Sequence, residues 1–230
     1  MTERTGAQLL VECLLAQDIE MGFGVPGESY LAVLDALHDV SNQFKFIGTR
    51  NEGGASFMAE AYGKLTGKPG LLMAQGPFAT STGAFGILEA YFSSSPMVIM
   101  TDTSCYDGFA QQGVYQTMTG DYGAGDAFAV LKTMTKYATY ATTPAEAIYG
   151  TQMAIKHAMT ARQGPAAMIM RTNIIKQEVP EEQRAKLYPT EGYLRHAPMV
   201  PDQAQLAQIA QAHLFIARVF GAKFRHRAPQ

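Results

Sequence analysis

The feature that most constrains the fold of this chain is a regular alternation of short apolar runs with longer amphipathic segments between residues 20 and 171. The apolar runs have the length and side-chain content of strands buried in a sheet, and the segments between them have helical spacing. The predicted strands are 20–25, 45–49, 70–74, 96–101, 135–139 and 166–171. Strands that alternate with helices over short turns are typical of parallel pairing. We therefore predict an α/β fold: a doubly wound, mostly parallel sheet of about six strands with helices on both faces.

Several of the predicted helices have recognisable end signals. Two begin with a capping box, in which a Thr hydroxyl and a Gln or Glu side chain satisfy amides of the first turn. The pairs are Thr5 with Gln8 and Thr143 with Glu146. Other helices are predicted over 29–40, 53–66 and 79–92. Residues 102–126 lose this pattern, and a loop of that length inside a compact domain is usually functional or a partner surface.

Composition excludes several classes of function. The 230 residues carry a net charge of −2, which gives no field for binding nucleic acid or an anionic membrane. No apolar run approaches the roughly 20 residues needed to span a bilayer. Cys13 and Cys105 have no metal-ligand spacing and form no disulfide framework, so we interpret both as small apolar residues in a reducing compartment. We predict a cytoplasmic protein without nucleic-acid or membrane partners.

Glu52 is the candidate functional acid. It lies between a predicted strand and a predicted helix, where open α/β sheets bind their ligands. The helix N-terminus stabilises the carboxylate by about 0.3–1 kcal/mol, whereas burial in an apolar crevice can raise a Glu pKa by up to about 3–5 units. If burial dominates, Glu52 can hold and return a proton near neutral pH. The alternative is an acidic first-turn residue in solvent.

Three motifs in order resemble the thiamin-diphosphate-dependent acetolactate synthase and decarboxylase family, in its N-terminal, pyrimidine-binding domain. Residues 22–28 (GFGVPGE) are similar to the family's VFGxPG turn. Residues 51–55 (NEGGA) match a second motif, and 75–81 (QGPFATS) are similar to its GPGATN loop. The resemblance covers roughly residues 5–171. The first motif also satisfies the dinucleotide pattern GxGxxG, but Gly22 and Gly24 lie inside a predicted strand, which argues against NAD.

The resemblance implies roles for particular residues. Glu52 would hydrogen-bond the ring nitrogen of the aminopyrimidine and stabilise its imino tautomer. The cofactor's own amino group would then remove the thiazolium proton, and the ylide would attack a 2-oxo acid such as pyruvate. Val25, Pro26 and Gly27 would line the pyrimidine side, and Pro77 would also contact the cofactor.

The resemblance places Phe78 and Gln116 near the substrate, and both lie in segments that depart from the family pattern. Phe78 stands where the family has Gly, so its bulk is expected to alter substrate shape or cofactor access. Ser81 stands where the family has Asn, and an ordinary turn capped by Thr80 or Ser81 is the alternative for this loop. Gln116 belongs to a weak match to an FQE segment in which Thr117 replaces the acid. A solvated loop amide is the alternative for Gln116.

No metal site is predicted within these residues. Gly120-Asp121 resembles the start of a Gly-Asp-Gly magnesium motif, but the only later Asn, Asn173, is too distant to complete it. The resemblance implies that a separate C-terminal domain holds the diphosphate and magnesium, and that the neighbouring subunit supplies this domain. We therefore expect thiamin diphosphate as cofactor, and a homodimer or tetramer in the full-length enzyme.

The sequence predicts three parts: a pyrimidine-binding domain over 1–172, a Pro-rich linker over 173–202, and a helical basic tail over 203–230. The tail has four basic residues and no acidic residue. Its sequence does not resemble the family's continuation, so we interpret it as a truncated or frame-shifted end. A peripheral basic helix is the alternative.

The function implied is that of an acetolactate synthase-like 2-oxo acid carboligase or decarboxylase, a transferase or lyase, whose N-terminal domain is inactive alone. Another branch of the family, such as sulfoacetaldehyde acetyltransferase or phosphonopyruvate decarboxylase, is one alternative. A different alternative is a non-catalytic or split-enzyme subunit that pairs with a separate diphosphate-binding subunit.

Overall fold

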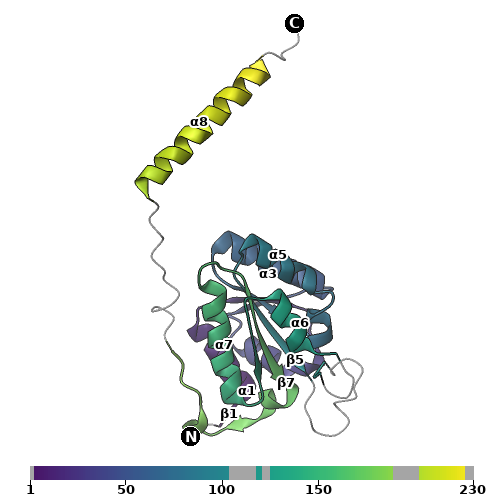
Figure 1. Cartoon of the computed structure of the whole chain (residues 1–230). Coiled ribbons are helices and arrows are strands. Elements are labelled where there is room, and N and C mark those ends of the chain that lie inside the picture. The colour runs from purple at the N-terminus through teal and green to yellow at the C-terminus, as the bar shows by residue number, and fades with distance from the viewer. Residues whose placement is uncertain (1–2, 104–117, 121–124, 189–201, 226–230) are drawn as a thin grey trace. The chain divides into compact units, whose positions relative to one another are not determined.

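The computed structural model describes residues 3–103, 118–120, 125–188 and 202–225 (Figure 1). The chain divides into two compact units, residues 1–195 and 196–230, and each is described by itself. Within the described residues, none of the helices combines the length and the hydrophobicity that crossing a membrane requires.

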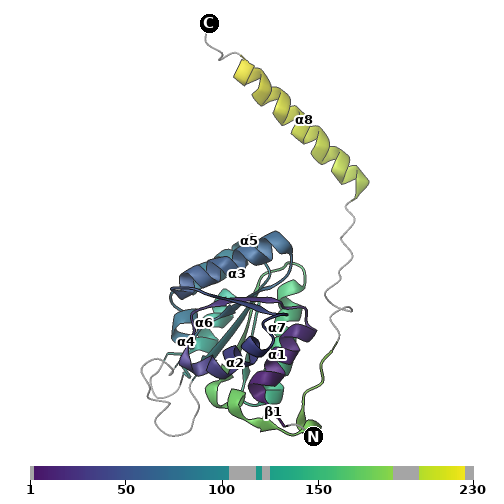
Figure 2. The same cartoon turned by 180° about the vertical axis from the view of Figure 1, so that it is seen from behind.

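A six-stranded sheet forms the centre of the first unit, in the order β3-β2-β4-β5-β7-β6. Every neighbouring pair in it is parallel. The strands are β2 (Met21–Gly24), β3 (Lys45–Gly48), β4 (Gly70–Met73), β5 (Met97–Thr103), β6 (Tyr137–Ala141) and β7 (Pro165–Arg171). Helices cover both faces (Figures 1 and 2). The predicted doubly wound α/β fold is confirmed, with all six predicted strands present.

Two hydrophobic cores lie on opposite faces of the sheet. One core is covered by α1 (Gly6–Ala16), α2 (Leu31–Asp39) and α7 (Pro144–Met159), and the other by α3 (Glu52–Thr66), α5 (Ala84–Ser93) and α6 (Ala127–Met134). Strand β5 contributes side chains to both cores, because successive side chains on a strand point to opposite faces. Val98 and Met100 belong to the first core, and Met97 and Ile99 to the second. Burial on both faces explains why this strand is an almost unbroken apolar run.

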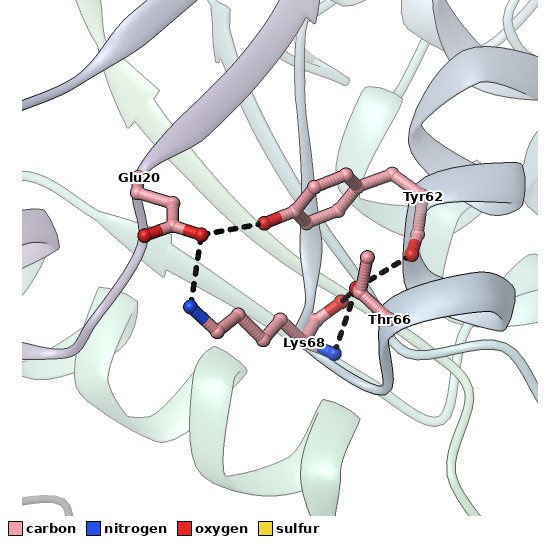
Figure 3. A network of polar contacts seen from close by, with 4 residues as sticks. All are labelled: Glu20, Tyr62, Thr66 and Lys68. Carbon is pink, nitrogen blue, oxygen red and sulfur yellow. Dashed lines mark hydrogen bonds and ion pairs between the residues drawn. The ribbon is translucent and has the colours of Figure 1, made fainter.

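A polar network fixes the C-terminal end of α3 (Figure 3). Gly67 ends the helix with a φ of 71°, a left-handed conformation that favours glycine. Just before β2, Glu20 accepts hydrogen bonds from the Tyr62 hydroxyl at 3.2 Å and from Lys68 Nζ at 2.8 Å. The hydroxyl of Thr66 donates to the Tyr62 carbonyl at 2.7 Å. Because this end of α3 is tied to the start of β2, the N-terminus of α3 lies at the opposite, carboxyl edge of the strands.

Two helical elements differ from the prediction. The helix expected over 79–92 begins only at residue 84, as α5, and the short helix α4 (Gly76–Ala79) precedes it. The hydroxyls of Thr80, Ser81 and Thr82 donate to the carbonyls of Gly76, Pro77 and Phe78, and such side-chain bonds compete with helix continuation. Helix α6 was not predicted. It begins after Asp126, whose side chain accepts a hydrogen bond from the Ala129 amide at 2.9 Å.

The segment that follows β7 lies against the domain as far as residue 188. It contains η3 (Thr172–Lys176), β8 (Glu178–Val179) and η4 (Glu181–Gln183). Strand β8 pairs antiparallel with β1 (Arg4–Thr5), and Ile174 and Ile175 are buried in the first core. The Tyr188 amide donates to Gln152 Oε1 at 2.7 Å. A linker starting at residue 173 remains a prediction, and the structure adds that residues 172–188 pack on the domain.

The second unit contains α8 (Gln203–Arg225), within the predicted helical tail. Its described side chains, over residues 203–219, are exposed.

Gly86, on α5, tests how closely this helix packs on α3. A Cβ at Gly86 would lie 2.5 Å from the Ser56 carbonyl carbon and 2.6 Å from the Phe57 nitrogen. Gly86→Ala is therefore expected to destabilise the protein by about 1–3 kcal/mol through overpacking. Gly54→Ala, also in a helix, is the matched control: its nearest neighbour lies 3.5 Å away, so it should gain about 0.5–1 kcal/mol from helix propensity. Urea unfolding measures both, and equal effects would contradict close packing of the two helices.

Candidate functional site

The candidate site lies at the carboxyl edge of the sheet. The chain passes from β2 to β3 on one side and then returns to β4 on the other side of β2. The strand order therefore reverses between β2 and β4, and open α/β sheets bind ligands outside the carboxyl ends of strands at such a point. The residues that follow these two strands are 25–27 and 75–77, and Glu52 follows the neighbouring strand β3.

The turn after β2 is fixed against the turn after β4. The buried Tyr30, in the 3₁₀ helix η1 (Glu28–Tyr30), donates its hydroxyl to the Val25 carbonyl, and the same hydroxyl lies 3.3 Å from the Met73 carbonyl. Gly27 lets the Gln75 side chain and the Tyr30 ring pack closely against the backbone, because a Cβ at residue 27 would lie 2.8 Å from Gln75 Cγ and 3.1 Å from the Tyr30 ring. The backbone of residues 25–27 is thus held in place by contacts with β4 and η1.

Glu52 is the first residue of α3 and is partly buried. The preceding residue, Asn51, caps the helix by accepting a hydrogen bond from the Gly54 amide at 2.7 Å. Thr49 joins this turn to β2, because both its amide and its hydroxyl donate to the Gly24 carbonyl, at 2.8 and 3.2 Å. Glu52 therefore has a defined backbone position beside the turn after β2.

Thr82 is a site residue that the sequence analysis missed. It lies in the turn between α4 and α5, and its hydroxyl is 3.4 Å from Glu52 Oε2 and 3.2 Å from the Phe78 carbonyl. It therefore joins the acid to α4, which carries the partly buried Pro77 and Phe78. The missed signal was a run of three hydroxyl residues before Gly83, which favours a break in a helix.

Asp102 is a second acid at this edge and was also missed. It lies near the end of β5, and only 1% of its surface is exposed. Burial raises the pKa of its carboxyl to about 7, although the Ser29 hydroxyl and the Gly76 amide favour the anion. Among the described residues, no donor makes a hydrogen bond of good geometry with either carboxyl oxygen. The sequence predicts residue 102 at the start of a loop rather than inside a strand.

The two acids at this edge both act on Tyr30. Burial raises the pKa of the Tyr30 hydroxyl most, and the charges of Asp102 and Glu52 raise it further. Both acids are thus close enough to Tyr30 to act on it across the ends of neighbouring strands. Among the described residues, no group of three or more His, Cys, Asp or Glu side chains is placed to hold a metal ion.

The sequence-predicted site residues that the structure describes lie on this same edge. They are Val25, Pro26, Gly27, Glu52, Pro77 and Phe78. Gln116, the other predicted substrate residue, lies outside the described residues.

Comparison with known proteins points to one family. The model of the family described as thiamine pyrophosphate enzyme, N-terminal TPP binding domain, matches residues 4–124. Acetolactate synthase from Bacillus subtilis is 42% identical over 101 residues, which cover 44% of this chain and 17% of that protein. The mitochondrial acetolactate synthase catalytic subunit of Saccharomyces cerevisiae is 39% identical over 98 residues, 42% of this chain and 14% of that protein. The aligned segment thus spans less than a fifth of these relatives.

Proposed function

This chain belongs to the thiamine pyrophosphate enzymes as their N-terminal TPP-binding domain, and from that premise we propose that its sheet edge binds the aminopyrimidine of thiamin diphosphate. The observation that carries the proposal is the position of Glu52 at the N-terminus of α3, beside the strand-order reversal between β2 and β4. In the family match, the motifs around residues 22–28, 51–55 and 75–81 all lie within the matched segment. All three motifs converge on this edge of the sheet.

The residues at the edge fit an aminopyrimidine. Among the described residues, the Glu52 carboxylate accepts a hydrogen bond only from Thr82, at 3.4 Å, so it can accept a stronger one from a ring nitrogen. In our proposal Glu52 shares a proton with that nitrogen, while Val25, Pro26 and Gly27 line one side of the ring and Pro77 lies nearby. Thiamin diphosphate, when bound, supplies the carbanion chemistry of 2-oxo acids. The protein orients the ring and holds one proton.

The proposed whole-protein activity is that of an acetolactate synthase-like 2-oxo acid carboligase or decarboxylase. The relatives named acetolactate synthase support this class of reaction. Phe78 is proposed to lie near the substrate, because it belongs to α4, which Thr82 joins to Glu52. We propose that the 230-residue chain alone binds thiamin diphosphate more weakly than micromolar and does not turn over, since other residues would hold the diphosphate and magnesium.

Glu52→Gln tests the cofactor proposal. Loss of a charge-assisted hydrogen bond costs about 1.5–3 kcal/mol, so affinity for thiamin diphosphate should fall about 10- to 100-fold. Asp39→Asn is the control, because Asp39 is exposed at the C-terminal end of α2, which leads into β3 and so lies at the opposite, amino edge of the strands, and it should leave the affinity unchanged. Nuclear magnetic resonance titration with cofactor and magnesium measures weak binding. An unchanged affinity in Glu52→Gln would contradict the proposed role, and micromolar binding by the unaltered chain would contradict the proposed weak affinity.

We also propose that the outer surface of α3 and α5 binds a second copy of this chain. The two helices lie side by side in both views (Figures 1 and 2). Their large exposed apolar side chains are Phe57, Met58, Leu65, Phe85, Tyr91 and Phe92. Phe85 and Phe92 are 74% and 71% exposed, and the rings of Phe57 and Phe85 are 6.1 Å apart. Large exposed apolar side chains on two neighbouring helices are typical of a protein interface. A separate diphosphate-binding subunit is the alternative occupant.

A further inference from the structure

Asp102 is a buried acid for which the proposed function has no use. Its main chain lies against Gly76, since a Cβ at Gly76 would collide with the Asp102 carbonyl oxygen. Its side chain points to the core that contains Tyr30 and Met100, because residues 98, 100 and 102 share a face of β5. Neither carboxyl oxygen has a well-formed hydrogen bond within the described part of the chain. A buried carboxyl of this kind needs an explanation.

A short series of contacts joins Asp102 to the turn that is proposed to bind the pyrimidine. The Ser29 hydroxyl is close enough to Asp102 to lower the pKa of its carboxyl. Gln75 Nε2 donates to the same Ser29 hydroxyl at 3.3 Å. The aliphatic part of Gln75 in turn packs against Gly27, where a Cβ would lie 2.8 Å from Gln75 Cγ. Asp102 thus lies behind the layer of side chains that supports residues 25–27.

We propose that Asp102 is a proton-dependent positioning residue: as the neutral acid it allows η1 to close over β5 and hold Gln75 against Gly27. Ionisation would leave a charge in this packed layer, and such a charge is satisfied only by admitting water or a cation. Water between η1 and β5 would loosen Ser29 and Gln75, and with them the turn at residues 25–27. The inference rests on the proposed cofactor site, to which it adds a dependence on pH.

The groups around Asp102 allow the direction of the pH effect to be stated. Tyr30 faces it from η1, and Glu52 acts on Tyr30 from α3. Gln75 and helix α4 present no titratable side chain. On the paired strand β7, Met170 lies opposite Asp102, and the side chain of Arg171 donates to the Tyr140 hydroxyl on the other face of the sheet. Among the described residues, no cation is among the causes that set the pKa of Asp102, which is about 7. The turn should therefore be closed at pH 6 and loosened at pH 8.

The experiment compares the full chain with Asp102→Asn and Asp102→Ala. The amide of Asn stays neutral and can donate to Ser29, so this variant should keep the closed turn at every pH, whereas Ala should loosen it at every pH. The first readout, in the absence of ligand, is the side-chain amide resonance of Gln75. It should shift with a midpoint near pH 7 in the unaltered chain and show no such step in Asp102→Asn.

The second readout is the affinity for thiamin diphosphate with magnesium. It should be about tenfold weaker at pH 8 than at pH 6 in the unaltered chain, because a group with a pKa of about 7 is then about tenfold less protonated. In Asp102→Asn the affinity should be equal at both pH values. If the Gln75 amide resonance shifted with pH in the same way in the unaltered chain and in Asp102→Asn, the inference would be overturned. No binding at pH 6 would overturn the proposed cofactor site, and the Gln75 readout would still decide the role of Asp102.

Discussion

Replacement of Asp102 by Asn should stabilise this protein at pH 8, by an amount on the order of 4 kcal/mol at most. Burial raises the pKa of the carboxyl from 3.8 to about 7 in the folded state. Each unit of difference between the folded and unfolded pKa corresponds to about 1.4 kcal/mol. A neutral amide of nearly the same shape avoids this cost, although its own polar atoms must still be buried.

The sign of the pH dependence follows from the same shift. Between pH 3.8 and about 7 the folded chain binds the Asp102 proton more tightly than the unfolded chain, so the free energy of unfolding falls as pH rises. Above pH 7 both states are ionised, and the contribution of this group is constant. Asp102→Asn should remove this slope, and its advantage should therefore grow from pH 4 to pH 7.

Urea unfolding at a series of pH values measures the effect, with the slope on denaturant checked for each protein. Asp35→Asn is the matched control, because Asp35 is exposed on α2. It should change the free energy of unfolding by less than about 0.5 kcal/mol at every pH. A variant at position 102 that is less stable than the unaltered chain at pH 8 would show that the carboxylate is well solvated or hydrogen-bonded.

The double variant Phe85→Asp, Phe92→Asp should convert an associated chain into a monomer. Both side chains are more than two thirds exposed on α5, and burying a Phe contributes about 1.5–3 kcal/mol. Introducing two carboxylates replaces that gain with the cost of desolvating charge in an apolar contact. We expect the dissociation constant of self-association to rise by at least about 100-fold.

Sedimentation equilibrium measures this constant, and circular dichroism confirms that the variants remain folded. Met153→Asp is the control, because Met153 is 38% exposed on α7, which covers the opposite face of the sheet. This control should leave association unchanged. If the unaltered chain is a monomer at high concentration, the proposed homodimer surface is wrong, and co-purification with a separate subunit becomes the remaining test of this face.

Much of the fold could be predicted from local patterns. The apolar run of β5 predicted a strand buried on both faces, and the capping box at Thr143 predicted the start of α7. Gly67 correctly marked the end of α3. These signals depend on residues within a few positions of one another, so they can be recognised from the spacing of apolar, capping and glycine residues in the sequence.

The differences arose where a distant contact or a competing side-chain bond decided the structure. Helix α5 starts late because the hydroxyls of residues 80–82 bond to carbonyls of the preceding turn. Residues 172–188 pack on the domain because Ile174 and Ile175 fill the core beside α1. Thr82 joins the site only through a fold that brings it to Glu52, 30 residues earlier in the chain.

The sequence by itself determined the six strands in their order along the chain, most of the helices between them, the family motifs, and the edge of the sheet on which residues 25–27, 52 and 77 gather. Only the tertiary structure decided that Asp102 is buried and that its pKa is raised. The physical reason is that the apolar pattern of a strand is visible in its own residues. The solvation of a carboxyl, in contrast, depends on which distant residues pack over it in the folded chain. Burial raises the pKa of Asp102, and the groups that lower it, Ser29 and Gly76, come from other parts of the chain.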